Sequence, residues 1–252
     1  LAKIEAAGLK PAPDAAPEVL ARRLSYQLTG LPPSLEGNSD LDTLLASPHF
    51  GEHFGQHWLD VARFAESSGG GRTLLFKDAW RYRDYVIEAF NANLPFDHFI
   101  REQLAGDLLP ASTPAERRRK LTATAFLALG PTNYEEQDKQ QLRFDIIDEQ
   151  LETIGKAFLG QTIGCARCHD HKFDPISDED FYALYGVFAS TRPTLSILDD
   201  PAALTAHDAE LVRKKDALRS ALAARWRRDV RSAGFQPAKN HVATEKASGT
   251  VF

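Results

Sequence analysis

Apolar residues recur every three or four positions along most of this 252-residue chain, and this spacing constrains its fold more than any other feature. Side chains three and four apart share one face of an α-helix, whereas a half-buried strand alternates apolar and polar residues. We find no convincing run of such alternation. The sequence therefore predicts an all-α fold, a multi-helix domain followed by an extended C-terminal amphipathic helix.

Residues with known preferences for helix ends set several of the expected boundaries. Pro17 suits the first turn of a helix, because that turn does not need the missing N–H, and Gly30 suits the end of the same helix. Ser177 and Asp180 have the spacing of a capping box, with Asp in place of the usual Glu or Gln. We expect a helix to begin at each of these N-terminal signals.

Other helices are expected from apolar spacing combined with weaker end signals. Asp78 is expected to cap a helix over residues 79–92. Pro95 is expected to open a helix that buries Phe96, Phe99, Ile100 and Leu104. Further helices are expected over residues 50–65, 114–129 and 142–158, and the last of these should lead straight into the two cysteines.

The C-terminal part differs from the rest in charge. Residues 211–239 hold nine Lys or Arg and two Asp, although the whole chain has a formal net charge of −5. We expect a helical domain over residues 1–192 and, over residues 193–252, a charged helical arm (residues 203–230) and a weakly ordered tail. A solvated or inter-domain arm is the preferred interpretation, and oligomerisation through it is possible.

Composition excludes some classes of partner. The net charge is too mild to favour nucleic acid or a membrane surface, and the arm carries only one aromatic residue, Trp226, for stacking on bases. No stretch approaches the ~20 apolar residues of a membrane span. We therefore expect neither nucleic-acid binding nor a membrane span.

The only two cysteines lie in the string Cys165-Ala166-Arg167-Cys168-His169. This is C-x-x-C-H, the attachment motif of c-type haem. Cysteines three apart lie on one side of a helical turn, so each thiol can form a thioether with a haem vinyl group. The next histidine can then bind the iron as proximal ligand. The motif predicts one covalent haem c on Cys165, Cys168 and His169.

Three other uses of these cysteines remain open. A disulfide between them would close only a very small loop. A thioredoxin-like redox pair needs a βαβ setting that the sequence lacks. Zinc is the strongest alternative because His171 would supply a fourth donor, although ligands so close in sequence would strain a tetrahedral site.

Several long segments resemble the planctomycete-type cytochrome c domain family, a domain of unknown function in large secreted bacterial proteins. The likeness covers about residues 1–192. It implies a mostly helical, haem-bearing domain that is commonly joined to further domains. The segments that carry it are GCARCHDHKFDPI (164–176), LLASPHFGEHFGQHWLDVARFAES (44–67), AWRYRDYVIEAFNANLPFDHFIREQLAGDLLP (79–110), LGPTNYEEQDK (129–139) and DEQLETIGKAFLGQTIG (148–164).

The sixth iron ligand must be sought among histidines if this chain supplies it. The chain has no methionine, which disfavours a His/Met cytochrome. His53 and His57 lie four apart on one predicted helix face beside aromatic residues, and we favour His57, which belongs to the HWLD string shared with the family. The alternative is a partly buried core histidine bonded to a carboxylate.

Arg63 and Arg81 are candidates for binding the haem propionates, because a guanidinium pairs with a carboxylate through two parallel hydrogen bonds. The alternative for both residues is a salt bridge between helices.

Together these patterns predict a c-type cytochrome domain that transfers single electrons to a partner protein or an adjoining domain. A haem enzyme, such as a peroxidase or a dehydrogenase acting on carbohydrate-related substrates, is the first alternative, so the sequence does not decide whether the chain is an enzyme. A structural or assembly module held together by haem is the second. Covalent haem attachment occurs outside the cytoplasmic membrane, so we expect a periplasmic or extracellular location. The chain begins without Met or signal peptide, and we expect it to be a mature or excised fragment.

Overall fold

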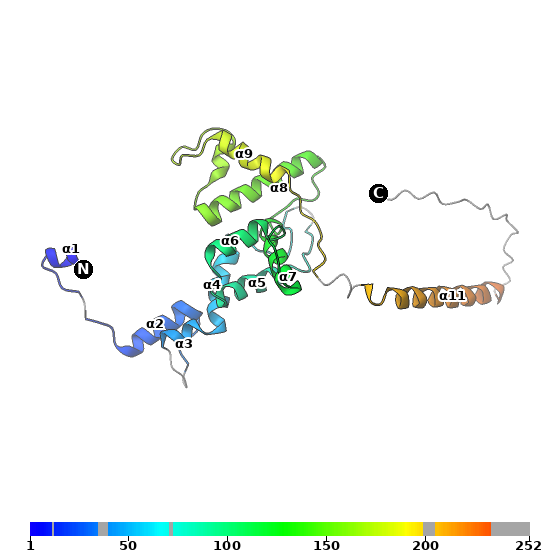
Figure 1. The fold of residues 1–252 in the computed structure, drawn as a ribbon, viewed down its shortest axis with the longest axis horizontal. Coiled ribbons are helices and arrows are strands. Elements are labelled where there is room, and N and C mark those ends of the chain that lie inside the picture. The colour runs from blue at the N-terminus through cyan, green and yellow to red at the C-terminus, as the bar shows by residue number, and fades with distance from the viewer. Residues whose placement is uncertain (12, 35–39, 71–72, 199–204, 233–252) are drawn as a thin grey trace. The chain divides into compact units, whose positions relative to one another are not determined.

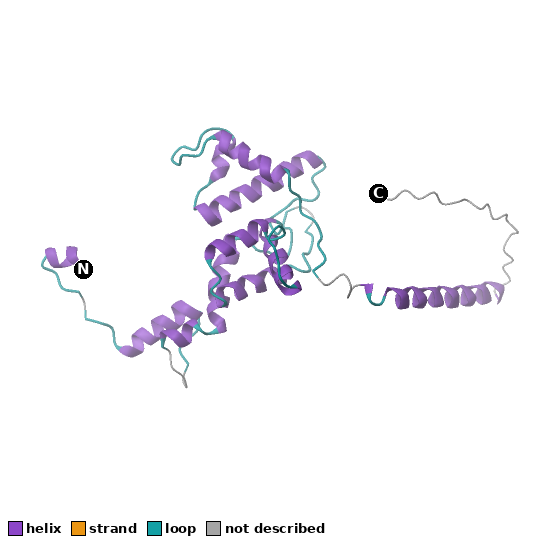
Figure 2. Cartoon of the chain, viewed as in Figure 1, coloured by secondary structure: helices purple, strands orange, loops and turns teal. Residues whose placement is uncertain are grey.

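The computed structural model describes residues 1–11, 13–34, 40–70, 73–198 and 205–232 of the chain, and its regular elements are helices (Figures 1 and 2). Among these residues the only β pairing is one isolated bridge between Ser67 and Leu75. The all-α prediction is therefore confirmed. The α-helices are α1 (Ala2–Ala6), α2 (Pro17–Thr29), α3 (Leu41–Leu45), α4 (Pro48–Val61), α5 (Trp80–Asn91), α6 (Phe96–Ala105), α7 (Pro114–Ala123), α8 (Lys139–Ile154), α9 (Asp178–Ala189) and α11 (Asp208–Ser232).

Three shorter helical segments complete the chain path. A 3-10 turn, η1 (Thr124–Leu127), follows α7, and a π-helical turn, η2 (Gly155–Leu159), follows α8. A second 3-10 turn, η3 (Ile163–Arg167), carries the first cysteine. 3-10 turns are common at the ends of α-helices, whereas a π-helical turn is rare.

The expected end signals of α2 and α9 are confirmed. Pro17 is the first residue of α2, and Gly30 ends it in the left-handed conformation (φ +70°), which glycine adopts without a steric penalty. At α9, the Ser177 hydroxyl accepts the N–H of Asp180, and the Asp180 carboxylate accepts the N–H of Ser177. This capping box also lowers the pKa of Asp180, because the carboxylate accepts the backbone hydrogen bond.

Two predictions about α5 and α6 are wrong. Asp78 does not cap α5, because Ala79 occupies the N-cap position and the Asp78 carboxylate pairs with Arg81 instead. Phe96 is 57% exposed, although α6 begins after Pro95 as expected. Phe99 is buried as expected, and two polar residues, Glu102 and Gln103, are buried beside it.

The predicted helix over residues 142–158 does not run unbroken into the cysteines. The α-helical hydrogen bonding of α8 ends at Ile154, the π-turn follows, and Gly160 then reverses the chain with φ +66°. The expected helix over residues 114–129 likewise tightens to a 3-10 turn after Ala123. The cysteine motif therefore lies on its own short turn.

The core of the described residues gathers large aromatic side chains around Trp58 of α4. Its ring contacts Phe99 from α6, at 4.9 Å between centroids, and Phe158 from η2, at 5.7 Å. Its indole N–H donates to the hydroxyl of Tyr82 on α5 (3.1 Å) and to the amide oxygen of Gln103 (3.0 Å). A buried indole needs such an acceptor, which explains why a polar glutamine lies fully buried beside it.

The chain divides into two compact units, residues 1–198 and 199–252. The domain boundary after residue 192 stays a prediction. Within the second unit, α11 exposes an apolar stripe formed by Leu211, Leu218, Leu222 and Trp226. The predicted weakly ordered tail, after Gly234, lies outside the described residues. None of the described helices combines the length and apolarity of a membrane span.

A pair of glycine substitutions tests the packing of the turn before the cysteines. A methyl group on Gly155 would lie 2.7 Å from the backbone oxygen of Gln161 and 2.9 Å from the side chain of Ile163. We expect Gly155→Ala to lower the free energy of unfolding by about 1–3 kcal/mol through overpacking. The measurement is chemical denaturation followed by circular dichroism.

Gly186→Ala is the matched control, because Gly186 lies within α9 with no atom within 4 Å of its added methyl group. Alanine should raise the free energy of unfolding there by about 0.4–1 kcal/mol. Equal effects at the two positions would contradict this account of the π-turn.

Candidate functional site

The turn η3 presents both cysteines to solvent because its other side is buried. Ile163 is 4% exposed and Ala166 is fully buried, whereas Cys165 and Cys168 are exposed free thiols. A 3-10 helix has three residues per turn, so positions i and i+3 lie one above the other. Cys165 belongs to η3 and Cys168 is its C-terminal cap. The spacing and the turn type together place the two thiols on one side.

Three polar contacts hold this turn against the neighbouring helices. The N–H of Gly164 donates to the carboxylate of Glu152 on α8 (2.9 Å), and the guanidinium of Arg167 pairs with Asp148 on the same helix (2.7 Å). From α9, the hydroxyl of Tyr182 donates to the backbone oxygen of Arg167 (3.0 Å). The residues that flank the two cysteines are therefore tethered, and neither thiol is in a disulfide, although the Cys165 thiol donates to the hydroxyl of Thr162 (3.9 Å).

The Arg167–Asp148 pair combines attraction with partial burial. Burial raises the pKa of Asp148, the Arg167 charge lowers it, and the nearby carboxylates of Glu152 and Asp145 raise it further. The pKa of Arg167 is raised, chiefly by the negative charge of Asp148. The pair therefore holds the Arg167 guanidinium, which is charged in any case, in place beside the cysteine turn.

His169 is exposed, and its ring is oriented by one short contact. Its Nδ1 lies 2.7 Å from the backbone oxygen of Asp170. A carbonyl oxygen only accepts, so Nδ1 must carry the proton and donate it. The other nitrogen, Nε2, then keeps its lone pair for a metal ion, which is the usual arrangement of a metal-binding histidine.

His171 has a different role from the fourth donor that the zinc alternative requires. Its side chain is only 7% exposed, and its Nδ1 accepts the backbone N–H groups of Phe173 and Asp174 (3.3 and 2.9 Å). It therefore shapes the loop after the motif. Within the described ranges, no three His, Cys, Asp or Glu side chains gather closely enough to hold a metal ion.

Large apolar side chains lie exposed on the segments that flank the cysteine turn. Phe173, in the loop after the motif, is 83% exposed, and Leu159, at the end of η2, is 59% exposed. Tyr182 on α9 is 54% exposed although its hydroxyl is bonded to the turn. Exposed apolar groups of this size are costly in water and often mark a binding surface when they are contiguous.

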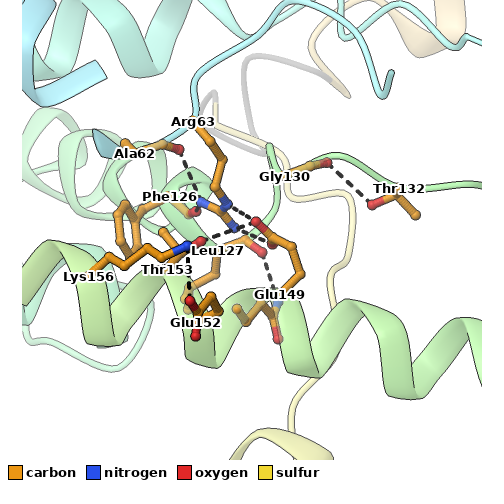
Figure 3. A network of polar contacts seen from close by, with 11 residues as sticks. Ala62, Arg63, Phe126, Leu127, Gly130, Thr132, Glu149, Glu152, Thr153 and Lys156 are labelled. Atoms are coloured by element: carbon orange, nitrogen blue, oxygen red, sulfur yellow. Dashed lines mark hydrogen bonds and ion pairs between the residues drawn. The ribbon is translucent and has the colours of Figure 1, made fainter. Parts of the chain in front are cut away.

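Arg63 is engaged by the protein itself, as Figure 3 shows. Two of its nitrogens, Nε and Nη2, pair with the carboxylate of Glu149 on α8, and Nη1 donates to the backbone oxygens of Ala62 (3.1 Å) and Phe126 (2.7 Å). This is the salt bridge between chain segments that the sequence offered as the alternative. Propionate binding by Arg63 stays a prediction, and it would require the guanidinium to exchange partners.

Arg81 is less constrained. It lies on α5, pairs with the exposed Asp78 (3.2 Å), and places its guanidinium 4.6 Å from the centre of the Trp80 ring. No polar contact among the described residues joins it to the cysteine turn. Its role toward a propionate also stays a prediction.

His57 is exposed on α4, next to the buried side of Trp58. Its ring contacts are with His53 (5.0 Å between centroids) and Phe54 (6.3 Å). In the described part of the chain, no hydrogen bond, ion pair or ring contact links it to Cys165, Cys168 or His169. Its imidazole has no hydrogen-bond partner there, so both nitrogens are accessible, and its role as sixth ligand remains a prediction.

The sequence did not reveal the residues that anchor the turn, Asp148, Glu152 and Tyr182. They lie 12 to 19 positions from their partners, so no local spacing signals the contacts. The sequence has an excess of acidic residues before the motif. This excess is compatible with contacts to the cysteine turn, but equally with a helix face in solvent.

Lysine substitutions compare how much the contacts of Arg63 and of Arg81 contribute to stability. Arg63 has φ +48°, and lysine would have the same backbone strain, so Arg63→Lys changes only the side-chain contacts. We expect it to lower the free energy of unfolding by about 2–3 kcal/mol, because lysine cannot pair twice with Glu149 and also bond the Phe126 oxygen. Arg81→Lys, at an exposed pair, should cost about 0–1 kcal/mol. Urea denaturation measures both, and equal losses would refute the distinction.

Comparison with known proteins gives one result. No curated protein and no solved structure matches this chain. The model of one family, PSCyt2, described as a protein of unknown function (DUF1549), matches residues 1–193. This match spans α1 to α9 and includes the cysteine turn and all three contacts that hold it. The chain therefore belongs to the PSCyt2 (DUF1549) family.

Proposed function

We propose that this chain is a c-type cytochrome domain that holds one haem covalently at Cys165, Cys168 and His169. It exchanges single electrons with an adjoining domain or a partner protein. The observation that carries the proposal is the state of these three side chains. Both cysteines, at i and i+3, are exposed and outside any disulfide, and the histidine after them has its Nδ1 proton engaged and its Nε2 available.

The chemistry of the donor set fits this cofactor. Each thiol can add across a vinyl double bond, so that sulfur bonds to one carbon, the thiol hydrogen ends on the other, and no electron is gained or lost. Bound haem supplies a one-electron redox centre. The exposed side chains of Leu159, Phe173 and Tyr182 offer apolar surface on the segments beside the turn, which suits a large flat apolar ligand.

The chain's own residues orient the attachment site. Burial of Ala166 and the contacts of Gly164 and Arg167 with α8 fix the turn, so the thiols start from a defined position. The Asp170 carbonyl holds the His169 ring through Nδ1 and strengthens Nε2 as a ligand, because a hydrogen bond at one nitrogen increases the basicity of the other. Covalent haem attachment takes place outside the cytoplasmic membrane, so the proposal includes a periplasmic or extracellular location.

Covalent attachment is tested by extraction. The full chain, produced together with a c-type cytochrome maturation apparatus, should retain its haem absorbance after treatment with acidified acetone. The double variant Cys165→Ala/Cys168→Ala should retain none, and either single variant should retain haem through one thioether at reduced yield. Haem that passes into the acetone, or a wild-type chain without haem absorbance, would refute the proposal.

Histidine substitutions test the iron ligands separately. His169→Ala should abolish haem incorporation, whereas His98→Ala is the control, because His98 is exposed and lies only near Asp97 (3.7 Å). If His57 is the sixth ligand, His57→Ala should change a low-spin absorption spectrum to a high-spin one, and His53→Ala should leave it unchanged. An unchanged spectrum in His57→Ala would exclude His57 as the ligand.

A further inference from the structure

Three oxidisable side chains follow one another through the core of the first unit. Trp58 on α4 donates its indole N–H to the hydroxyl of Tyr82 (3.1 Å), and the ring of Tyr82 stacks on that of Tyr85, at 6.1 Å between centroids. Tyrosine and tryptophan lose one electron more readily than the other aromatic side chains. Their direct contact here gives an uninterrupted series across α4 and α5.

One end of this series lies beside the structure that carries the cysteines. The ring of Trp58 lies 5.7 Å from that of Phe158, in the π-turn that leads to the motif. In the same π-turn, Gly155 lies close to the cysteine turn, because a methyl group built on it would be 2.9 Å from the side chain of Ile163. The Trp58 end of the series is therefore joined to the cysteine turn through η2.

The other end lies beside a surface cavity, although Tyr85 itself is 3% exposed. Tyr85 lines a surface cavity of about 340 Å³ between α5 and α7, together with Trp80, Arg81 and Arg119. Trp80 is 41% exposed, so the cavity is open to small molecules from solution. The series therefore joins the core beside the cysteine turn to a solvent-accessible site.

The last tyrosine has a base in place for its proton. The Tyr85 hydroxyl donates to the carboxylate of Glu102 (3.1 Å), which is 3% exposed and also pairs with Arg119 (2.5 Å). Burial raises the pKa of both Tyr82 and Tyr85 above the usual range, so both phenols are protonated at neutral pH. Oxidation of a phenol requires that its proton leaves with the electron, and a hydrogen-bonded carboxylate can accept that proton.

From this geometry we infer that Trp58, Tyr82 and Tyr85 form a relay that carries an oxidising equivalent from the cysteine turn to the cavity beside α7, with Glu102 as proton acceptor. The inference rests on the proposed haem site. It adds a second function to this unit, which is the removal of oxidising equivalents from the cofactor before they damage the surrounding core.

Each turn of the relay moves one electron and one proton. A one-electron oxidant held at the cysteine turn would take one electron from Tyr85, through Tyr82 and Trp58, while the Tyr85 proton moves to Glu102. A phenolic or enediol reductant in the cavity then returns one electron to the Tyr85 radical, and Glu102 returns the proton.

The test replaces the haem with a photochemical oxidant at the same position. In the full-length Cys168→Ala chain, Cys165 is the only cysteine and is exposed, so it can be labelled with a thiol-reactive ruthenium polypyridyl complex. A laser flash with an electron-accepting quencher generates ruthenium(III) there. We expect a tyrosyl radical, detected by transient absorption and by electron paramagnetic resonance after rapid freezing.

Variants identify the path. Tyr85→Phe should abolish the tyrosyl signal, and Trp58→Phe or Tyr82→Phe should slow its formation several-fold. Glu102→Gln cannot accept the proton, so the radical should remain on tryptophan. Tyr182→Phe is the matched control, because Tyr182 contacts the cysteine turn directly but has no contact with the relay residues in the described ranges. Circular dichroism confirms that each variant is folded.

Two results would overturn the relay, namely a tyrosyl signal that persists at full yield in Tyr85→Phe and one that disappears in Tyr182→Phe. Because ruthenium takes the place of haem, this test does not depend on haem attachment. Failure of the extraction test would therefore refute the haem proposal alone, and failure of the flash experiment would refute the relay alone.

Discussion

The site depends on the burial of one small side chain, that of Ala166. Because this residue and Ile163 face inward on the same short turn, the two cysteines project outward and are exposed. A larger side chain would not fit without moving α8 or α9, which pack against the turn. The hydrogen bonds to Gly164 and Arg167 then fix the direction in which the thiols point. Packing of one side of η3 against the neighbouring helices thus leaves both thiols on the exposed side.

A second interaction, made by Arg63, joins the end of α4 to α8 and η1. Arg63, just after α4, contacts Glu149 of α8 and two backbone oxygens, one of which belongs to Phe126. Its five N–H groups in a fixed planar arrangement allow one side chain to bond three chain segments. Trp58, on the same helix that leads to Arg63, contacts Phe158 in the π-turn. The Arg63 contacts therefore also support the aromatic series in the core.

The two proposals use opposite properties of the chain. Haem attachment needs exposed thiols and an available imidazole nitrogen, and both lie on a short surface turn. The relay needs buried aromatic rings in contact and a buried carboxylate, and these lie on the longer helices α4, α5 and α6. Glu102, the proposed proton acceptor, is a buried carboxylate. At 3% exposure it is stable only when it is paired and hydrogen-bonded. Arg119 and Tyr85 provide those partners.

The sequence by itself determined the helical class, the start and end of α2, the capping box of α9 and the location of the cysteine motif. These features depend on spacing or on contacts within a few residues, so local chemistry is sufficient to predict them. The tertiary structure decided that α8 breaks before the motif, that Phe96 faces solvent while Gln103 is buried, and that Arg63 is occupied by Glu149. Each of these depends on which residues, distant in sequence, meet in the fold, and the burial of a side chain is a property of its neighbours in space.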